Sequence, residues 1–164
     1  MRCAWQAYLN ILPVWMRQEV DRLAKHDLQE LRLRLNQKPE LITGRGSLCL
    51  NREAAAEDLQ YIVNVASRYS PWTAATSAQG YITAPGGHRI GLCGAAVIAD
   101  GQMTGIREPS SMCVRVARDF PGISSAAAAL SGSVLIIGRP GSGKTTLLRD
   151  IIRQRSDKGT GSIA

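Results

Sequence analysis

The sequence predicts an α/β protein, in which an α+β N-terminal module with a mixed sheet precedes the opening strand, loop and helix of a phosphate-loop domain. Short alternating and helical hydrophobic patterns succeed one another through the first 125 residues. An apolar run at Val134–Ile137, a glycine-rich motif at 138–145 and a helical pattern at 146–153 then follow in the order of a phosphate-loop unit. We therefore expect an N-terminal module, a connector and an incomplete nucleotide-binding domain at 1–125, 126–132 and 133–164.

The first fifty residues predict two helices and a three-stranded meander. An apolar stripe around Pro13 has helical spacing, and packing on the module's own core is favoured for it over attachment to a membrane surface. The stripe comprises Trp5, Tyr8, Ile11, Leu12 and Trp15. A second helical pattern covers residues 14–26. The alternation over 28–35 indicates a half-buried strand with Leu31, Leu33 and Leu35 facing inward. Further strands are expected at 40–43 and 47–50.

A helix and further strands are expected after residue 50. Asn51 is the expected N-cap of a helix over 52–69. The inner face of this helix would carry Leu59, Ile62, Val63 and Ala66. The alternating patterns that follow predict strands at 79–83, 88–98 and 112–117. Asp100-Gly101 marks a tight turn. The Ala-rich segment 124–130 predicts a short helix or connector.

The glycine-rich motif reads Gly-Arg-Pro-Gly-Ser-Gly-Lys-Thr and matches the phosphate-loop pattern G-x-x-x-x-G-K-[ST]. Its glycines let the backbone curl so that N–H groups face a phosphate, and the following helix presents its positive end to the same place. Lys144 is expected to reach the β- and γ-phosphates, Thr145 to hold Mg²⁺ and Thr146 to lie beside the α-phosphate. The sequence thus predicts an ATP and Mg²⁺ site formed by Gly138, Pro140, Gly141, Ser142, Gly143, Lys144, Thr145 and Thr146.

Hydrolysis of the nucleotide needs more than this loop. An acidic residue that assists Mg²⁺, a group that orients the attacking water and an arginine at the developing charge complete such sites. Nineteen residues follow Thr145, and they offer no second strand that could carry these groups. We therefore expect this chain to be a fragment or truncated protein that binds nucleotide at most weakly and lacks the parts for hydrolysis.

Composition argues against several other classes of protein. The net charge is +7. Residues 132–164 hold six of the 20 basic side chains but only two of the 13 acidic ones, and a phosphate site explains this local excess of positive charge. Direct nucleic-acid binding is disfavoured, because the chain has one Phe and no basic run interleaved with aromatic residues. The four cysteines form no C-x-x-C pair and are expected to stay reduced. No apolar stretch reaches the roughly 20 residues of a membrane span, so a cytoplasmic protein is expected.

Three segments, in this order and spacing, resemble a known family. They are Leu-Gln-Glu-Leu-Arg-Leu-Arg at 28–34, Gln-Gly-Tyr-Ile-Thr with Gly-Gly-His-Arg-Ile-Gly at 79–91, and Gly-Lys-Thr-Thr-Leu-Leu-Arg-Asp at 143–150. Through them the chain resembles the stage III sporulation protein AA family of endospore-forming Firmicutes. The resemblance implies a RecA/AAA-like ATPase similar to secretion and pilus motors. Such a protein would act in the mother cell, at the inner face of the membrane beside the channel to the forespore.

The resemblance also implies partners and further site residues. The partners would be copies of the same chain in a ring and other stage III sporulation channel proteins. Arginines of the N-terminal domain reach the nucleotide in secretion motor ATPases, and Arg89 and Arg115 lie in similar strands, which makes them candidate catalytic residues. Their forked donors suit phosphate oxygens. An exposed arginine paired with a surface carboxylate explains each of them equally well.

Other interpretations stay open at this point. His88 is interpreted as a turn or core histidine, and Trp72 and Tyr81 as core residues rather than adenine contacts. The chain could also be a non-catalytic interaction module that assembles with channel partners. A nucleic-acid-associated phosphate-loop protein is supported by the charge alone, and a salt-sensitive affinity for DNA or RNA would favour it.

Overall fold

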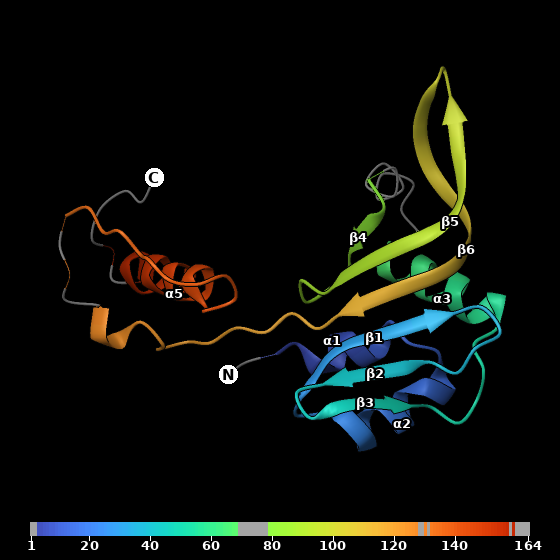
Figure 1. The fold of residues 1–164 in the computed structure, drawn as a ribbon, viewed down its shortest axis with the longest axis horizontal. Helices are drawn as coiled ribbons and strands as arrows, with labels where there is room; N and C mark the ends of the chain where they lie inside the picture. The colour runs from blue at the N-terminus through green and yellow to red at the C-terminus, as the bar shows by residue number, and fades with distance from the viewer. Residues whose placement is uncertain (1–2, 69–78, 128–129, 131, 158, 160–164) are drawn as a thin grey trace. The chain divides into compact units, whose positions relative to one another are not determined.

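The computed structural model describes residues 3–68, 79–127, 130, 132–157 and 159. The chain divides into two compact units, an N-terminal unit at Cys3–Ala117 and a C-terminal unit from Arg118 onward (Figure 1). Residues 118–125, which the sequence analysis assigned to the N-terminal module, group with the phosphate-loop segment in this division.

A six-stranded sheet forms the centre of the N-terminal unit. Its strand order is β3-β2-β1-β6-β5-β4. The α+β class is confirmed, and the sheet is antiparallel at every pair of neighbours rather than mixed. The physical reason is that short hairpin turns join most consecutive strands and reverse the chain. The strands are β1 (Leu28–Arg34), β2 (Glu40–Thr43), β3 (Gly46–Cys49), β4 (Tyr81–Thr83), β5 (Arg89–Ala99) and β6 (Gln102–Arg115).

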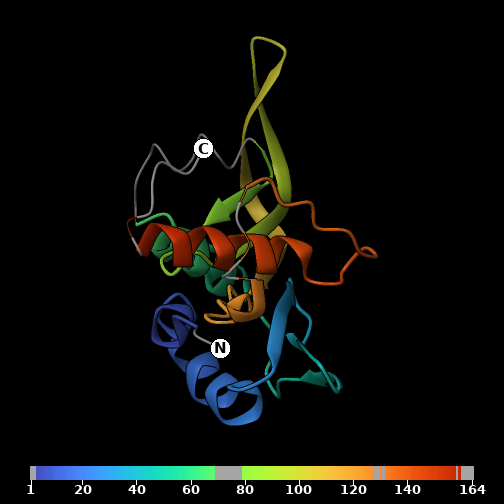
Figure 2. The same cartoon turned by 90° about the vertical axis from the view of Figure 1, so that its left-hand side faces the viewer.

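Three helices cover one face of this sheet. They are α1 (Trp5–Asn10), α2 (Val14–Ala24) and α3 (Ala56–Ala66), and Figure 2 shows them on the same side of the strands. Pro13 separates α1 from α2, as the sequence predicted. Tyr8, Ile11 and Leu12 of the apolar stripe are fully buried in the core, so the interpretation that the stripe packs on its own module is confirmed.

Strand β1 departs from its predicted pattern at two positions. Leu31 and Leu33 are fully buried, but the Leu35 side chain is 38% exposed. The strand ends at Arg34, and the chain turns away at Asn36, which has a φ of 57°. Glu30, expected on the solvent side, is only 8% exposed because Arg32 and Arg115 cover its carboxylate. The alternation therefore identifies the strand but not its end.

The expected N-cap at Asn51 is wrong. Helix α3 begins five residues later, at Ala56, and the Asp58 carboxylate accepts a hydrogen bond of 2.9 Å from the Ala55 N–H. The side chain of Asn51 instead donates to Glu19 over 2.8 Å. The delay has a tertiary cause, because the N–H groups of Leu50 and Ala54, at the two ends of this segment, bond to the carbonyl oxygens of Pro39 and Gln37. The expected inner face is buried at Leu59, Ile62 and Ala66.

Strands β5 and β6 form a hairpin that is longer than the sequence predicted. The tight turn at Asp100-Gly101 is confirmed, and both residues have positive φ, as a two-residue type I′ turn requires. Strand β6 begins at Gln102, whereas the alternating pattern predicted a strand only from residue 112. Residues 102–110 of β6 are mostly exposed, so their sequence shows no regular hydrophobic alternation. The register also shifts beside Gly94, where an added Cβ would lie 2.6 Å from the Arg107 carbonyl oxygen.

The C-terminal unit contains a short 3₁₀ turn, η1 (Ser125–Ala127), and helix α5 (Lys144–Asp157). The helix confirms the predicted pattern at 146–153. The expected strand at Val134–Ile137 is wrong, because this segment pairs with no strand in the described part of the chain. Leu135 and Ile137 are 82% and 84% exposed. A strand needs a hydrogen-bonded neighbour, and none of the described strands provides one.

Candidate functional site

The phosphate-loop motif adopts a curled backbone directly before α5. Gly141 and Gly143 have φ values of 75° and 86°, a region that side chains other than glycine rarely enter. At Gly138, an added Cβ would lie 2.7 Å from the Ser142 Oγ. The conformation of the loop therefore favours glycine at 141 and 143, and at Gly138 a side chain would require the Ser142 hydroxyl to move.

Lys144 closes the loop from the first residue of α5. Its Nζ donates hydrogen bonds to the carbonyl oxygens of Gly138 and Arg139, over 2.9 and 2.8 Å. The N–H groups of the first helical turn lack partners within the helix and carry the positive end of its dipole. Thr145 is exposed on the same turn, and Thr146 is half-buried. The structure thus brings together all eight residues that the sequence assigned to the nucleotide.

Among the described residues, no group of three or more His, Cys, Asp or Glu side chains could hold a metal ion. Within the same residues, the hydroxyl of Thr145 is the group that the motif places for a nucleotide-bound Mg²⁺.

Arg89 and Arg115 are brought together in the N-terminal unit, where they face each other across β5 and β6. The Arg115 Nε donates to the Glu30 Oε2 over 3.0 Å. The guanidinium of Arg89 lies 4.7 Å from the centre of the Tyr81 ring. Arg115 therefore has the carboxylate partner that the alternative interpretation expected. A role of either arginine at a nucleotide stays a prediction.

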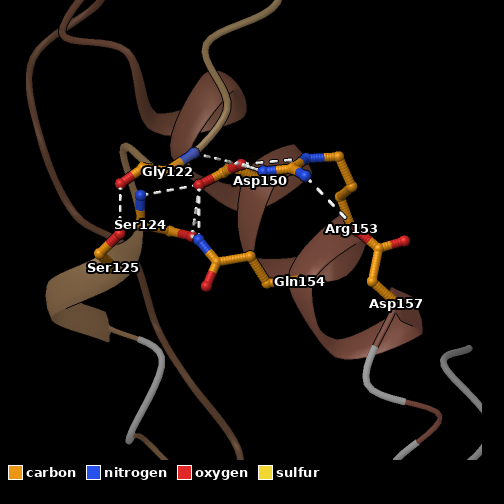
Figure 3. A network of polar contacts seen from close by, with 7 residues as sticks. All are labelled: Gly122, Ser124, Ser125, Asp150, Arg153, Gln154 and Asp157. Atoms are coloured by element: carbon orange, nitrogen blue, oxygen red, sulfur yellow. Dashed lines mark hydrogen bonds and ion pairs between the residues drawn. The ribbon is translucent and has the colours of Figure 1, made fainter.

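Asp150 of α5 holds the C-terminal unit together in a way that sequence analysis missed (Figure 3). Its carboxylate is 2% exposed and accepts hydrogen bonds from the N–H groups of Gly122 and Ser124, over 3.1 and 2.8 Å. The Ser124 hydroxyl and the Gln154 amide also donate to it, over 2.7 and 2.9 Å, and Arg153 forms an ion pair with it. Bonding to the Ser124 hydroxyl, followed by the Arg153 guanidinium, holds the pKa of Asp150 well below its usual range. The sequence did offer one signal of this role, because Asp150 directly precedes Ile151 and lies on the apolar side of the predicted helix.

The comparisons with known proteins decide the family. The family described as "Sporulation stage III, protein AA" matches residues 5–163. The chain belongs to this family. A curated relative, stage III sporulation protein AA of Bacillus subtilis (strain 168), is 34% identical over 156 residues that make up 90% of this chain and 51% of the relative. The chain therefore spans about half the length of that stage III sporulation protein AA.

Among solved structures, the chain is similar to the X-ray structure of the ATPase DotB of Legionella pneumophila. The sequence identity is 22% and the TM-score is 0.49, and the match covers 87% of this chain and 42% of DotB. Within the described residues of the chain, no helix is both long enough and apolar enough to cross a bilayer.

His88 is a core residue, as interpreted from the sequence. It is fully buried, and its ring meets the Tyr8 ring edge-on at a centroid distance of 5.1 Å. The Ala117 N–H donates to Nδ1 over 3.0 Å, so Nε2 carries the proton and donates to the Ala4 carbonyl oxygen over 3.1 Å. Trp72 lies outside the described residues, and Tyr81 lies beneath Arg89.

Glu30 is the charged centre of the arginine-rich outer side of the sheet. Burial on its own would raise the pKa of Glu30. Hydrogen bonds from Arg32, Cys113 and Arg115 outweigh the burial, and the pKa falls from 4.5 to about 2. The carboxylate thus stays charged in the folded protein at pH values where an unfolded chain would protonate it.

The depressed pKa predicts acid sensitivity of the N-terminal unit. The stabilisation from Glu30 is complete above about pH 5 and is lost as the pH falls from 4.5 towards 2, because the unfolded state then binds the extra proton. Between pH 6 and pH 2.5, the wild type should lose on the order of 1–3 kcal/mol more stability than Glu30→Gln. Urea unfolding followed by tryptophan fluorescence measures this, with exposed Glu53→Gln as control. Equal losses in the wild type and Glu30→Gln would contradict the assignment.

Proposed function

We propose that residues 138–146 of this chain bind ATP with Mg²⁺. The observation that supports this most strongly is the curled loop with Lys144 inside it, placed directly at the start of α5. The ammonium group and the free N–H groups of the first helical turn are donors of one sign that converge on one place. A polyphosphate is the ligand that matches such a set.

The chain's own residues would act at the phosphates in distinct ways. Lys144 would exchange its bonds to the carbonyl oxygens of Gly138 and Arg139 for bonds to the β- and γ-phosphates. Gly141 and Gly143 keep the backbone free of side chains on the ligand side, and the Thr145 hydroxyl would orient the metal ion. When bound, Mg²⁺ supplies charge neutralisation of the phosphates. The loop would bind and position the nucleotide, and Arg89 and Arg115 stay the candidate catalytic residues by resemblance to secretion motor ATPases.

At the level of the whole protein, we propose an ATP-binding subunit of a sporulation-stage transport or channel complex. The support is membership of the stage III sporulation protein AA family together with the phosphate loop. The proposed place is the cytoplasm of the mother cell, peripheral to the inner face of the membrane. The proposed partners are further copies of the chain in a ring and other stage III sporulation channel proteins.

Replacing Lys144 tests the binding proposal. Titration of a fluorescent ATP analogue in the presence of Mg²⁺ should give at least about tenfold weaker binding for Lys144→Ala, because the variant loses a charge-assisted contact worth about 1.4 kcal/mol or more. The matched control is Lys38→Ala, since Lys38 is an exposed lysine outside the loop. Equal affinities of Lys144→Ala and the wild type would rule out the loop as the nucleotide site.

A second candidate function is a non-catalytic interaction module. It is favoured by an open groove of about 700 Å³ between α3 and β6, whose lining includes Ala56 and Tyr61 of α3 and Pro109 of β6. Channel partners that bind this unit with equal affinity in the wild type and in Lys144→Ala, with no nucleotide bound, would support this function over the first.

A further inference from the structure

The Asp150 network ties the phosphate-loop helix to the segment that leads out of the N-terminal unit. Gly122 and Ser124 lie five and seven residues after Ala117, the last residue of that unit. Both of their N–H groups point at the Asp150 carboxylate (Figure 3). We call the contacts of Gly122 and Ser124 with Asp150 the Asp150 anchor.

Apolar packing contributes little to holding α5 in the described part of the C-terminal unit. Among its described residues, Ile151 is the one buried apolar side chain, and the two buried polar residues, Ser124 and Asp150, both belong to the anchor. Leu148 and Ile152 of the same helix are 46% and 41% exposed. Because apolar burial is so small, the position of α5 depends mainly on hydrogen bonds, namely those of the anchor and the 2.6 Å bond from Arg155 to the Leu130 carbonyl oxygen.

The anchor lies close to the proposed site along a rigid element. Lys144 and Asp150 are six residues apart in one helix, which corresponds to about 9 Å along its axis. A movement of Asp150 relative to Gly122 and Ser124 therefore also moves Lys144 and Thr145. The Ser124 hydroxyl makes two hydrogen bonds, because it donates to Asp150 and accepts a 2.9 Å bond from Gln154. These bonds define the anchored arrangement.

We propose that Asp150 is a positioning residue of the phosphate site, which couples the occupancy of the loop to the docking of segment 122–124 on α5. This inference rests on the proposed ATP binding. Coupling is reciprocal, so an anchor that strengthens nucleotide binding is itself strengthened by nucleotide. The Asp150 carboxylate then links the phosphate site to segment 122–124, which follows the N-terminal unit in the chain.

Hydrogen exchange of the wild-type chain tests the coupling without any substitution. With ATP and Mg²⁺ at about 100 times the dissociation constant, the amides of Gly122 and Ser124 should exchange at least about fivefold more slowly, with an upper limit of about a hundredfold. The amide of Leu41, in β2, serves as the internal reference. Unchanged exchange at Gly122 and Ser124 in a chain that binds ATP would overturn the inference and leave the proposed function standing.

Variants of the anchor provide the second readout. Asp150→Ala should weaken ATP binding at least about fivefold, and Asp150→Asn, which keeps one carbonyl acceptor, should recover part of the loss. The control is Asp157→Ala on the same helix, since Asp157 pairs with Arg153 outside the anchor. Wild-type affinity in Asp150→Ala would overturn the inference. If the wild type binds no ATP, both the inference and the proposed function fail.

Discussion

Replacing His88 with Ala is expected to destabilise the N-terminal unit by about 3–5 kcal/mol. The substitution empties a fully buried position against Tyr8 and removes the ring from both of its hydrogen bonds. The Ala4 carbonyl and the Ala117 N–H then lose their partners, and a buried polar group without a partner costs about 1–3 kcal/mol. A loss of this size is a large part of the stability of a typical domain.

The same residue predicts a pH dependence. Burial lowers the pKa of His88 from 6.5, whereas its hydrogen bond to Ala4 raises it by less. Protonation of His88 would also place a hydrogen on Nδ1, where it would face the Ala117 N–H and replace the hydrogen bond with a contact between two donors. The folded state therefore keeps His88 neutral, and stability is complete above about pH 6.5 and falls as the pH drops below it, because the unfolded chain binds the proton first.

Urea unfolding at pH 8 and pH 5.5, followed by tryptophan fluorescence, measures both effects. Trp5 and Trp15 pack on the core of the N-terminal unit and report on its unfolding. The wild type should lose more stability than His88→Ala over this pH interval. A destabilisation by His88→Ala below about 1 kcal/mol, or the same pH dependence in both proteins, would show that the ring does not hold the core as described.

The second large effect is expected from Leu31→Ala, at about 2–5 kcal/mol. Leu31 lies in the central strand β1, is fully buried, and faces Leu41 of β2 and Val114 of β6 in the register of the sheet. Its truncation removes apolar contacts and leaves a cavity that two well-packed neighbouring strands cannot easily close. The matched control is Leu48→Ala, because Leu48 lies in the edge strand β3 and is 44% exposed. Similar urea midpoints for the two variants would contradict the placement of the core.

Elements with a local cause were predictable from the sequence. Strand β2 at Glu40–Thr43 and the turn at Asp100-Gly101 follow from short-range alternation and from residues that tolerate positive φ. The phosphate loop belongs to the same class, because its glycines, Lys144 and the start of α5 are neighbours in the chain. That these residues bind a nucleotide stays a prediction.

Features with a non-local cause were not predictable. Asn51 has the composition of an N-cap, but pairing of residues 50–54 with Pro39 and Gln37 delays α3. The apolar run Val134–Ile137 has the composition of a strand, but no described strand pairs with it. Asp150 has an ordinary helical context, and its importance depends on partners 26 and 28 residues earlier in the chain. Tertiary contacts decide each of these cases.

The central claim is that ATP with Mg²⁺ binds at residues 138–146. Amide NMR of the chain during titration with ATP and Mg²⁺ tests it most directly, because the resonances identify the residues that respond. The account predicts saturable shifts of the amides of Gly141, Gly143, Lys144 and Thr145, and their loss in Lys144→Ala. Saturable binding that leaves these four amides unmoved, or no binding at all, would contradict the account.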